Sequence, residues 1–287
     1  VVILKGESEE VYTIGKMLVF QLQGLIEAYQ ERYGKDNFIK NLLLDNMLMV
    51  DILGRAKRLH IDIHARRVVF LIETDMSKDE APLELVRSLF AVQPKNFITA
   101  VDEKNIILIK MMEENETLDD LDKTANVIVD MLNAEAMTNV HVSYGTIIEE
   151  LKDVSKSYKE AKLALDVGRI FYSEKRVIAY WNLGIGRLIY QLPMNLCKMF
   201  INEVFRDVSA DQFDEETLNT VNKFFECNLN VSETAREKFI HRNTLVYRLD
   251  KIQKDTGMNL RLFDDAITFK IAMMVVKYME YLETMDY

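Results

Sequence analysis

Cationic, amide and hydroxyl side chains are concentrated between residues 242 and 251, near the start of an expected helix. With about 3.6 residues per turn, Thr244, Tyr247, Arg248 and Lys251 lie on one side of that helix. Arginine can donate two hydrogen bonds to guanine and asparagine can pair with adenine, while hydroxyl groups suit phosphates. The pattern is therefore typical of a helix that recognises double-stranded DNA, and an ordinary solvated helix with Lys and Arg on its face is the alternative that it leaves open.

Two helices joined by a tight turn are expected to position these groups, as in a helix-turn-helix over about residues 231–254. Ser232 is expected to cap the first helix, because its hydroxyl can accept a bond from a free backbone N–H. That helix should run from Glu233 to about Phe239. Ala235 and Phe239 would then share a face, since they lie four residues apart.

The second helix is expected to begin near His241 or Arg242, with His241 ordering the turn and not binding metal. The apolar stripe that this helix should bury consists of Leu245, Leu249 and Ile252.

Local charge agrees with a DNA contact. From Val231 to Lys254 there are six Lys or Arg and three Asp or Glu, a net of +3, whereas Ser209 to Asn230 has one Lys and five acids, a net of −4. Phosphate neutralisation dominates DNA affinity, so this basic island matters more than the total charge of −10. An ordinary solvated helix face would show a similar stripe. An acidic chain would bind DNA weakly as one domain, which favours a homodimer with two half-sites.

The run from Ile240 to Ile252, followed by Thr256 to Leu260, resembles the C-terminal helix-turn-helix of the CdaR/PucR regulators of bacteria. The family hallmark is His-x-Asn-Thr-x-x-Tyr-Arg-Leu and then Thr-Gly-x-x-Leu, and both are present in order. The DNA-facing set that this resemblance implies is Arg242, Asn243, Thr244, Tyr247 and Arg248. We expect Ser232, Thr234 and Lys251 to contact DNA as well.

The length of 287 residues suggests about two domains, and the few prolines and glycines predict a helix-rich chain without long linkers. Cys197 and Cys227 form no metal-binding spacing or disulfide framework, which predicts reduced thiols in the cytoplasm. Apolar runs are too short to span a membrane, and no signal peptide is visible. The chain begins with Val1 and not methionine, so the natural N-terminus is expected to lie upstream.

Residues 1–54 are expected to be the tail of an N-terminal sensor with its linking helices. A strand at Val1–Lys5 should lead into a helix, and a break at Tyr33-Gly34 should separate it from a second helix over about Asp36–Leu59. The helices are long enough for a stalk or a dimerisation element. The segment loosely resembles the end of a sugar-diacid-recognition module, although a GAF-type sensor would look similar. Most of the sensor, with its small-molecule effector site, is expected to lie outside this chain.

Residues 55–184 show an α+β pattern, in which helices pack on a mainly antiparallel sheet. The expected strands are Val68–Ile72, Asn96–Thr99, Ile106–Ile109 and Val140–Gly145, and the expected helices are Thr117–Leu132 and a segment through Ser157 and Leu165. Residues such as Val142-Ser143-Tyr144-Gly145 and Tyr180-Trp181-Asn182 resemble the degenerate GGDEF-like domain of CdaR/PucR regulators.

The hairpin of this domain departs from that of active diguanylate cyclases. Ala100-Val101 stand where the enzymes have two glycines, so side chains obstruct the approach of a nucleotide phosphate. Asp102 and Glu103 are therefore interpreted as turn residues. A nucleotide-binding or cyclase-like enzyme built on this domain is the disfavoured alternative.

Residues 194–287 are expected to form an all-α DNA-binding domain, joined through a hinge at Gly184–Pro193. Its other helices should cover Asn195–Val208, Asp214–Cys227 and Phe263–Leu282, the last with Ala266, Phe269, Ala272, Met273 and Val276 facing inward. His60, Asp62 and His64 could be interpreted as metal ligands, but flanking cations disfavour this, and no cofactor is expected.

Together these observations predict a helix-rich α+β regulator, in which a GGDEF-like domain precedes a helix-turn-helix domain. The resemblance implies an activator of a catabolic operon that responds to a small metabolite such as a sugar diacid. The alternatives are an enzyme built on the middle domain and an interaction adaptor whose helix-turn-helix does not bind DNA.

Overall fold

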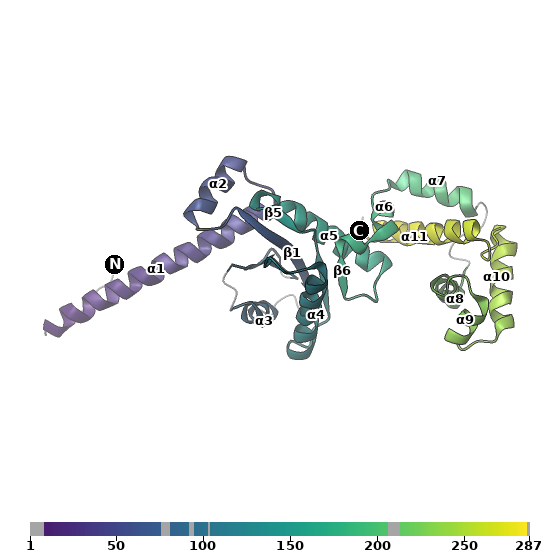
Figure 1. Cartoon of the computed structure of the whole chain (residues 1–287), viewed down its shortest axis with the longest axis horizontal. Helices are drawn as coiled ribbons and strands as arrows, with labels where there is room; N and C mark the ends of the chain where they lie inside the picture. The colour runs from purple at the N-terminus through teal and green to yellow at the C-terminus, as the bar shows by residue number, and fades with distance from the viewer. Residues whose placement is uncertain (1–8, 76–80, 92–94, 103, 206–212, 286–287) are drawn as a thin grey trace. The chain divides into compact units, whose positions relative to one another are not determined.

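The computed structural model describes residues 9–75, 81–91, 95–102, 104–205 and 213–285. In chain order its elements are α1 (Glu9–Leu43), α2 (Met49–Arg58), β1 (His64–Thr74), α3 (Ala81–Leu89), β2 (Phe97–Ala100), β3 (Asn105–Met111), α4 (Leu118–Glu135), β4 (Val140–Tyr144), β5 (Ile148–Glu150), η1 (Leu151–Asp153), α5 (Val154–Phe171), β6 (Val177–Ala179), η2 (Tyr180–Asn182), α6 (Gly184–Ile189), α7 (Met194–Phe205), α8 (Glu215–Glu226), α9 (Val231–Glu237), α10 (Arg242–Thr256) and α11 (Phe263–Met285) (Figure 1).

The chain forms two compact units, which confirms the α+β, helix-rich fold class. The first unit combines Val1–Asp166 with Glu174–Leu183 and contains the sheet, and the second combines Val167–Ser173 with Gly184–Tyr287 and is helical. The expected strand at Val1–Lys5 lies outside the described residues.

One sheet, with strand order β2-β3-β1-β4-β6, organises the first unit, and β5 pairs with β1. The β1–β3, β1–β4, β1–β5 and β2–β3 pairs are antiparallel, and β4 and β6 run parallel. The four strands expected from apolar runs are therefore confirmed. The strands β5 and β6 were not predicted, because each has three residues and so shows too little alternation to stand out.

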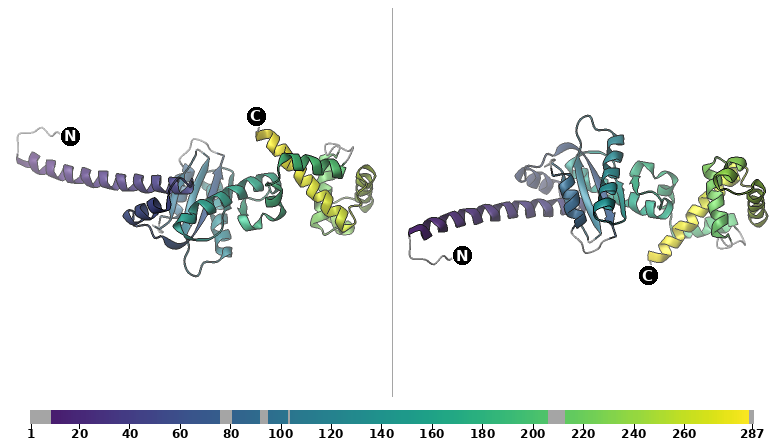
Figure 2. Two further views of the ribbon diagram at one scale, coloured as in Figure 1. Left: turned by 90° about the horizontal axis from the view of Figure 1, so that it is seen from above. Right: turned by 90° about the horizontal axis from the view of Figure 1, so that it is seen from below.

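Side chains of β1 alternate between two buried faces of the sheet, as the period of two in a strand requires. Val68, Phe70 and Ile72 pack with residues of α3 and α4, whereas Val69 and Leu71 pack with the end of α1 and with α2 and α5. Figure 2 shows the sheet with helices on both sides. Because both faces are covered, β1 is a continuous apolar run.

The helix α5 lies unusually close to the end of β4. Ser143 Oγ donates to the carbonyl oxygen of Ala161 at 2.8 Å, and Ser157 Oγ donates to that of Thr146 at 2.8 Å while accepting from Val69 N at 3.1 Å. A Cβ atom on Gly145 would lie 2.0 Å from the Ser157 carbonyl oxygen. Glycine is therefore required at position 145 by close approach, and the buried hydroxyls replace bonds that water would otherwise make.

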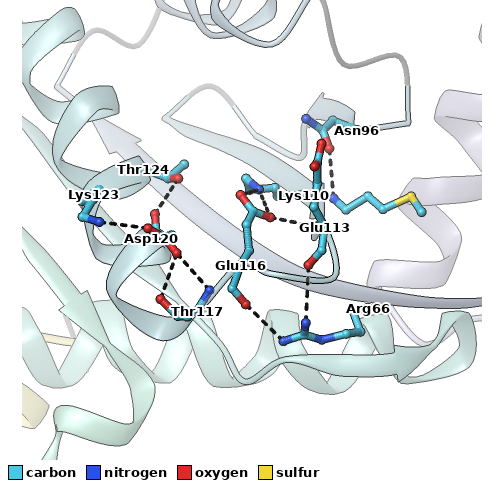
Figure 3. A network of polar contacts seen from close by, with 10 residues as sticks. Arg66, Asn96, Lys110, Glu113, Glu116, Thr117, Asp120, Lys123 and Thr124 are labelled. Atoms are coloured by element: carbon cyan, nitrogen blue, oxygen red, sulfur yellow. Dashed lines mark hydrogen bonds and ion pairs between the residues drawn. The ribbon is translucent and has the colours of Figure 1, made fainter.

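A polar network holds the connection between β3 and α4 (Figure 3). Lys110 is nearly fully buried, and its Nζ lies 2.5 Å from Glu116 Oε1. Arg66 donates to the carbonyl oxygens of Glu113, Glu114 and Glu116. The helix α4 begins directly after this connection. In its first turn, hydrogen bonds from Lys123 and Thr117 hold the pKa of the Asp120 carboxyl below its usual value. The network thus fixes the start of α4.

The predicted break at Tyr33-Gly34 is wrong, because α1 continues to Leu43. Glycine costs only about 1 kcal/mol in a helix interior. Here the last turns of α1 are held by the fully buried side chains of Phe38 and Leu43. The chain instead turns at Asp45, whose φ is 61°.

The core of the second unit forms around α11. Ala266, Phe269 and Ala272 are buried as expected, and Met273 and Val276 are partly buried against the same core. Both cysteines are buried and free. The segment interpreted as a hinge, Gly184–Pro193, is largely helical, since it contains α6.

Substituting Gly145 tests the close approach of α5 to β4. Gly145→Ala should lower the free energy of unfolding by about 3 kcal/mol, the upper end of the usual overpacking cost, because overpacking against backbone cannot be relieved by a rotamer change. The control is Gly54→Ala on α2, where an added Cβ meets nothing within 4 Å and should stabilise by up to about 1 kcal/mol. Chemical denaturation measures both, and a neutral Gly145→Ala would contradict the packing argument.

Candidate nucleic-acid interface

The first helix of the motif, α9, is capped by Asn230 and not by Ser232. Asn230 Oδ1 accepts hydrogen bonds from the backbone N–H groups of Ser232 and Glu233, both at 3.1 Å. The expected cap was therefore placed two residues late. Asparagine and serine cap helices about equally well, so their preferences could not decide between these positions.

The helix α9 ends at Glu237, with Lys238 as its C-cap. Phe239 follows in the turn with φ of 54° and a side chain that is 96% exposed. The expectation that Phe239 lies in the helix and shares a face with Ala235 is wrong, because Ala235 is buried. Ile240 instead packs into the core that contains Leu245.

The second helix, α10, starts at Arg242, as expected. His241 is its N-cap, and the Nδ1 atom of His241 accepts from the backbone N–H of Asn243 at 3.2 Å. The predicted stripe of Leu245, Leu249 and Ile252 is fully buried, which confirms the helical register. The helix ends at Gly257, whose φ of 79° suits a residue without a Cβ atom.

The opposite side of α10 is exposed to solvent. Its exposed members from the predicted set are Arg242, Asn243, Thr244, Tyr247 and Lys251. Asn243, Tyr247 and Lys251 follow an i, i+4, i+8 spacing and so form one line along the helix. This line is called the outer stripe below.

Lys254, which the sequence reasoning missed, is also exposed on α10. It lies in the last turn of the helix, seven residues after Tyr247, and therefore extends the outer stripe. The seven-residue spacing was the signal that could have found it.

Arg248 is turned away from the outer stripe and toward α8. Its Nη1 atom donates to Thr220 Oγ1 at 2.5 Å and its Nη2 atom donates to Glu216, so that its side chain is only 15% exposed. Arg248 thus joins α8 to α10. A contact between Arg248 and DNA stays a prediction and would require this pairing to open.

The two predicted residues of α9 differ in their access to solvent. Ser232 is exposed, whereas Thr234 is fully buried and its Oγ1 atom donates to the carbonyl oxygen of Asn230 at 2.8 Å. Thr234 therefore supports the cap of α9 and does not lie on the surface.

An acidic group on α10 is neutralised locally. Asp250 Oδ1 lies 2.8 Å from Arg261 Nη2, so its charge is compensated beside the outer stripe. A carboxylate that is already paired with a cation weakens the attraction between Lys251 and a phosphate less than a free carboxylate would. From Arg242 to Thr256 there are four Lys or Arg and two Asp, a net of +2, which suits a polyanion.

The described residues contain no group of three or more His, Cys, Asp or Glu side chains that could hold a metal ion. His60, Asp62 and His64 are disfavoured as metal ligands by the cations that flank them. Asp62 Oδ1 accepts a hydrogen bond from the backbone N–H of His64 at 3.0 Å, so its carboxylate stabilises a local turn. No helix within the described ranges is long and apolar enough to cross a membrane.

Two known domain families match this chain, one in each unit. Residues 217–275 match the PucR C-terminal helix-turn-helix domain, and residues 46–167 match the GGDEF-like domain. The chain carries both domains of the CdaR/PucR-type regulators. The matched helix-turn-helix contains α9, α10 and the outer stripe.

Relatives of this chain include transcription regulators, which supports a DNA-binding regulator. A carbohydrate diacid regulator of Escherichia coli (strain K12) is 25% identical over 94% of this chain and 74% of that protein. A purine catabolism regulatory protein of Bacillus subtilis (strain 168) is 27% identical over 50% of this chain and 27% of that protein. The proline-responsive transcriptional activator PutR of the same organism is 20% identical over 94% of this chain and 67% of that protein.

Arg248→Ala should destabilise the helical unit by about 1 kcal/mol, because it removes charged hydrogen bonds that solvent partly screens. A double-mutant cycle with Glu216→Ala should give a coupling energy of about 0.5–1 kcal/mol. Lys254→Ala on the same helix is the control and should leave stability unchanged. Calorimetric unfolding measures these values, and an unchanged midpoint for Arg248→Ala would show that Arg248 does not join the helices.

Proposed function

We propose that this CdaR/PucR-type chain is a sequence-specific DNA-binding transcription regulator, acting in the cytoplasm as an activator of a catabolic operon. The observation that carries the proposal is the outer stripe of α10. Polar and cationic side chains cover the surface of a helix whose other side is fixed to the core. A helix of this kind can enter the major groove by its N-terminal half.

The exposed residues differ in the chemistry that they offer to DNA. Arg242 and Asn243, in the first turn of α10, are suited to guanine and adenine edges. Thr244 and Tyr247 offer hydroxyl groups, and Lys251 offers a charge, all of which suit phosphates. Specificity would therefore come from the first turn and affinity from the remainder.

The effector is proposed to be a small metabolite such as a sugar diacid, bound by a sensor outside this chain. Support comes from the relatives described above, which are named for carbohydrate diacids, purine catabolism and proline. An effector can shift the regulator only if it binds the active arrangement of the two helix-turn-helix units more tightly than the other.

The GGDEF-like domain is proposed to have no catalytic role. Asp102, at the hairpin, accepts hydrogen bonds from the backbone N–H groups of Lys104 and Asn105 and from the Asn105 side-chain amide. Its carboxylate is therefore used by the turn itself. Glu103 lies outside the described residues.

A homodimer is proposed to form through α1. The described side chains in the first half of this helix include several large apolar groups in water, among them Tyr12, Met17 and Phe20. Long helices gain most of their stability in proteins from packing an apolar face, and this part of α1 has no such packing in one chain. Pairing with a second copy would supply it and would bring two helix-turn-helix units to one operator.

Binding to DNA from the region upstream of the gene, compared with random DNA, tests the proposed function. Asn243→Ala should reduce the preference for the specific fragment about tenfold, with little change in salt dependence. Lys251→Ala should weaken binding to both fragments. It should also reduce by about 1 the steepness with which the logarithm of affinity falls with the logarithm of salt concentration. Fluorescence anisotropy at several salt concentrations measures both effects.

The matched control for these variants is Lys198→Ala, which removes an exposed lysine from α7. It should change neither the preference for the specific fragment nor the salt dependence of binding. Wild-type protein that binds both fragments equally would reject sequence-specific regulation. If the protein were instead an interaction adaptor, Asn243→Ala would leave its affinity for both DNA fragments unchanged.

Phe20→Glu should convert a dimer to a monomer, because a charge replaces a ring that is 78% exposed in the single chain and would be buried between two copies. Val127→Glu, on the exposed side of α4, is the control and should leave the dimer intact. Sedimentation velocity measures the oligomeric state. A dimer that persists in Phe20→Glu would show that the dimer interface does not include Phe20.

A further inference from the structure

The turn between α9 and α10 combines two unfavourable features at one residue. Phe239 has φ of 54°, in the left-handed region that glycine and asparagine tolerate best. Its aromatic ring is 96% exposed, so the turn exposes a large apolar group to water. Strained residues of this kind concentrate at sites where a ligand or partner is contacted.

The strain is imposed by the turn and not by packing of the ring. The backbone N–H of Phe239 donates to the carbonyl oxygen of Arg236 at 3.1 Å, and that of Ile240 donates to Ala235 at 3.0 Å. Ile240 is packed in the core beside Leu245, which directs the chain into α10. Since glycine would satisfy the same backbone, the side chain at position 239 adds nothing to the fold of the turn.

We propose that Phe239 is a DNA-contacting residue, whose ring packs on a thymine methyl group or on deoxyribose carbons at the groove that α10 enters. This inference rests on the proposed function. Phe239 lies two residues before the N-cap of α10, next to the exposed first turn. Apolar contact with a thymine methyl group is an established mode of base readout.

The charge around the ring favours DNA over a second copy of this chain. From Glu233 to Arg242 there are three Lys or Arg and two Glu, a net of +1, and Glu233 lies 3.8 Å from Arg236, which leaves Lys238 and Arg242 as the cations nearest to the ring in sequence. Two such surfaces repel one another, whereas a row of phosphates attracts them. The cations would bring the ring against the DNA, and the ring would then add a contact that salt does not screen.

A matched control is present in the other unit. Met137 also has a left-handed backbone, with φ of 50°, and its large apolar side chain is 90% exposed. It lies after α4 in the GGDEF-like domain. Met137→Gly therefore makes the same change in backbone strain and exposed apolar surface as Phe239→Gly, outside the helix-turn-helix.

The experiment compares the full 287-residue chain with Phe239→Gly, Phe239→Asn, Phe239→Tyr and Met137→Gly, using the specific and random DNA fragments. Phe239→Gly and Phe239→Asn should keep or raise the melting temperature. Their affinity for the specific fragment should fall about tenfold, as expected for losing a buried ring contact. The loss should be equal at low and high salt, because the ring releases no counterions. Phe239→Tyr and Met137→Gly should bind within about twofold of wild type.

Each contrary result has a distinct meaning. If wild type prefers the specific fragment but Phe239→Gly and Phe239→Asn bind equally well, the inference about Phe239 fails and the proposed function stands. If wild type shows no preference and Asn243→Ala has no effect, the proposed function fails and this inference fails with it. If Phe239→Gly changes the sedimentation of the free protein and not its affinity for DNA, the ring contacts a second copy, and the inference is overturned.

Discussion

Burial of one side of α10 is the constraint on which the candidate interface depends. A helix of 15 residues is marginal in water by itself, so α10 owes its stability to the packing of Leu245, Leu249 and Ile252. That packing also fixes the rotation of the helix about its axis. The outer stripe is exposed because the opposite side is fully buried.

Polar contacts refine this arrangement at the two ends of the motif. Asn230 and His241 satisfy backbone donors at the starts of α9 and α10, and Arg248 joins α10 to α8. The side chains that hold the motif together are therefore different from those of the outer stripe. This separation lets the outer stripe vary in sequence without loss of the fold.

The first unit is held together by buried contacts on both faces of its sheet. The sheet is packed on both faces, and Gly145 lets α5 approach β4 closely, so the architecture rests on buried contacts. At the hairpin, Asp102 accepts hydrogen bonds from the backbone N–H groups of Lys104 and Asn105, and Val101 packs against the core on the α5 side of the sheet. The side chains of Ala100 and Val101 occupy space that glycines would leave open.

The sequence by itself determined the α+β class, the main strands and the buried stripe of α10, because apolar periodicity records burial directly. It also led to the CdaR/PucR resemblance through closely spaced residues of α10. Tertiary structure alone decided that α1 continues past Gly34, that Thr234 is buried, and that Arg248 turns toward α8. Spacing along a helix shows which side a residue occupies, but the neighbouring helices determine which part of that side remains exposed.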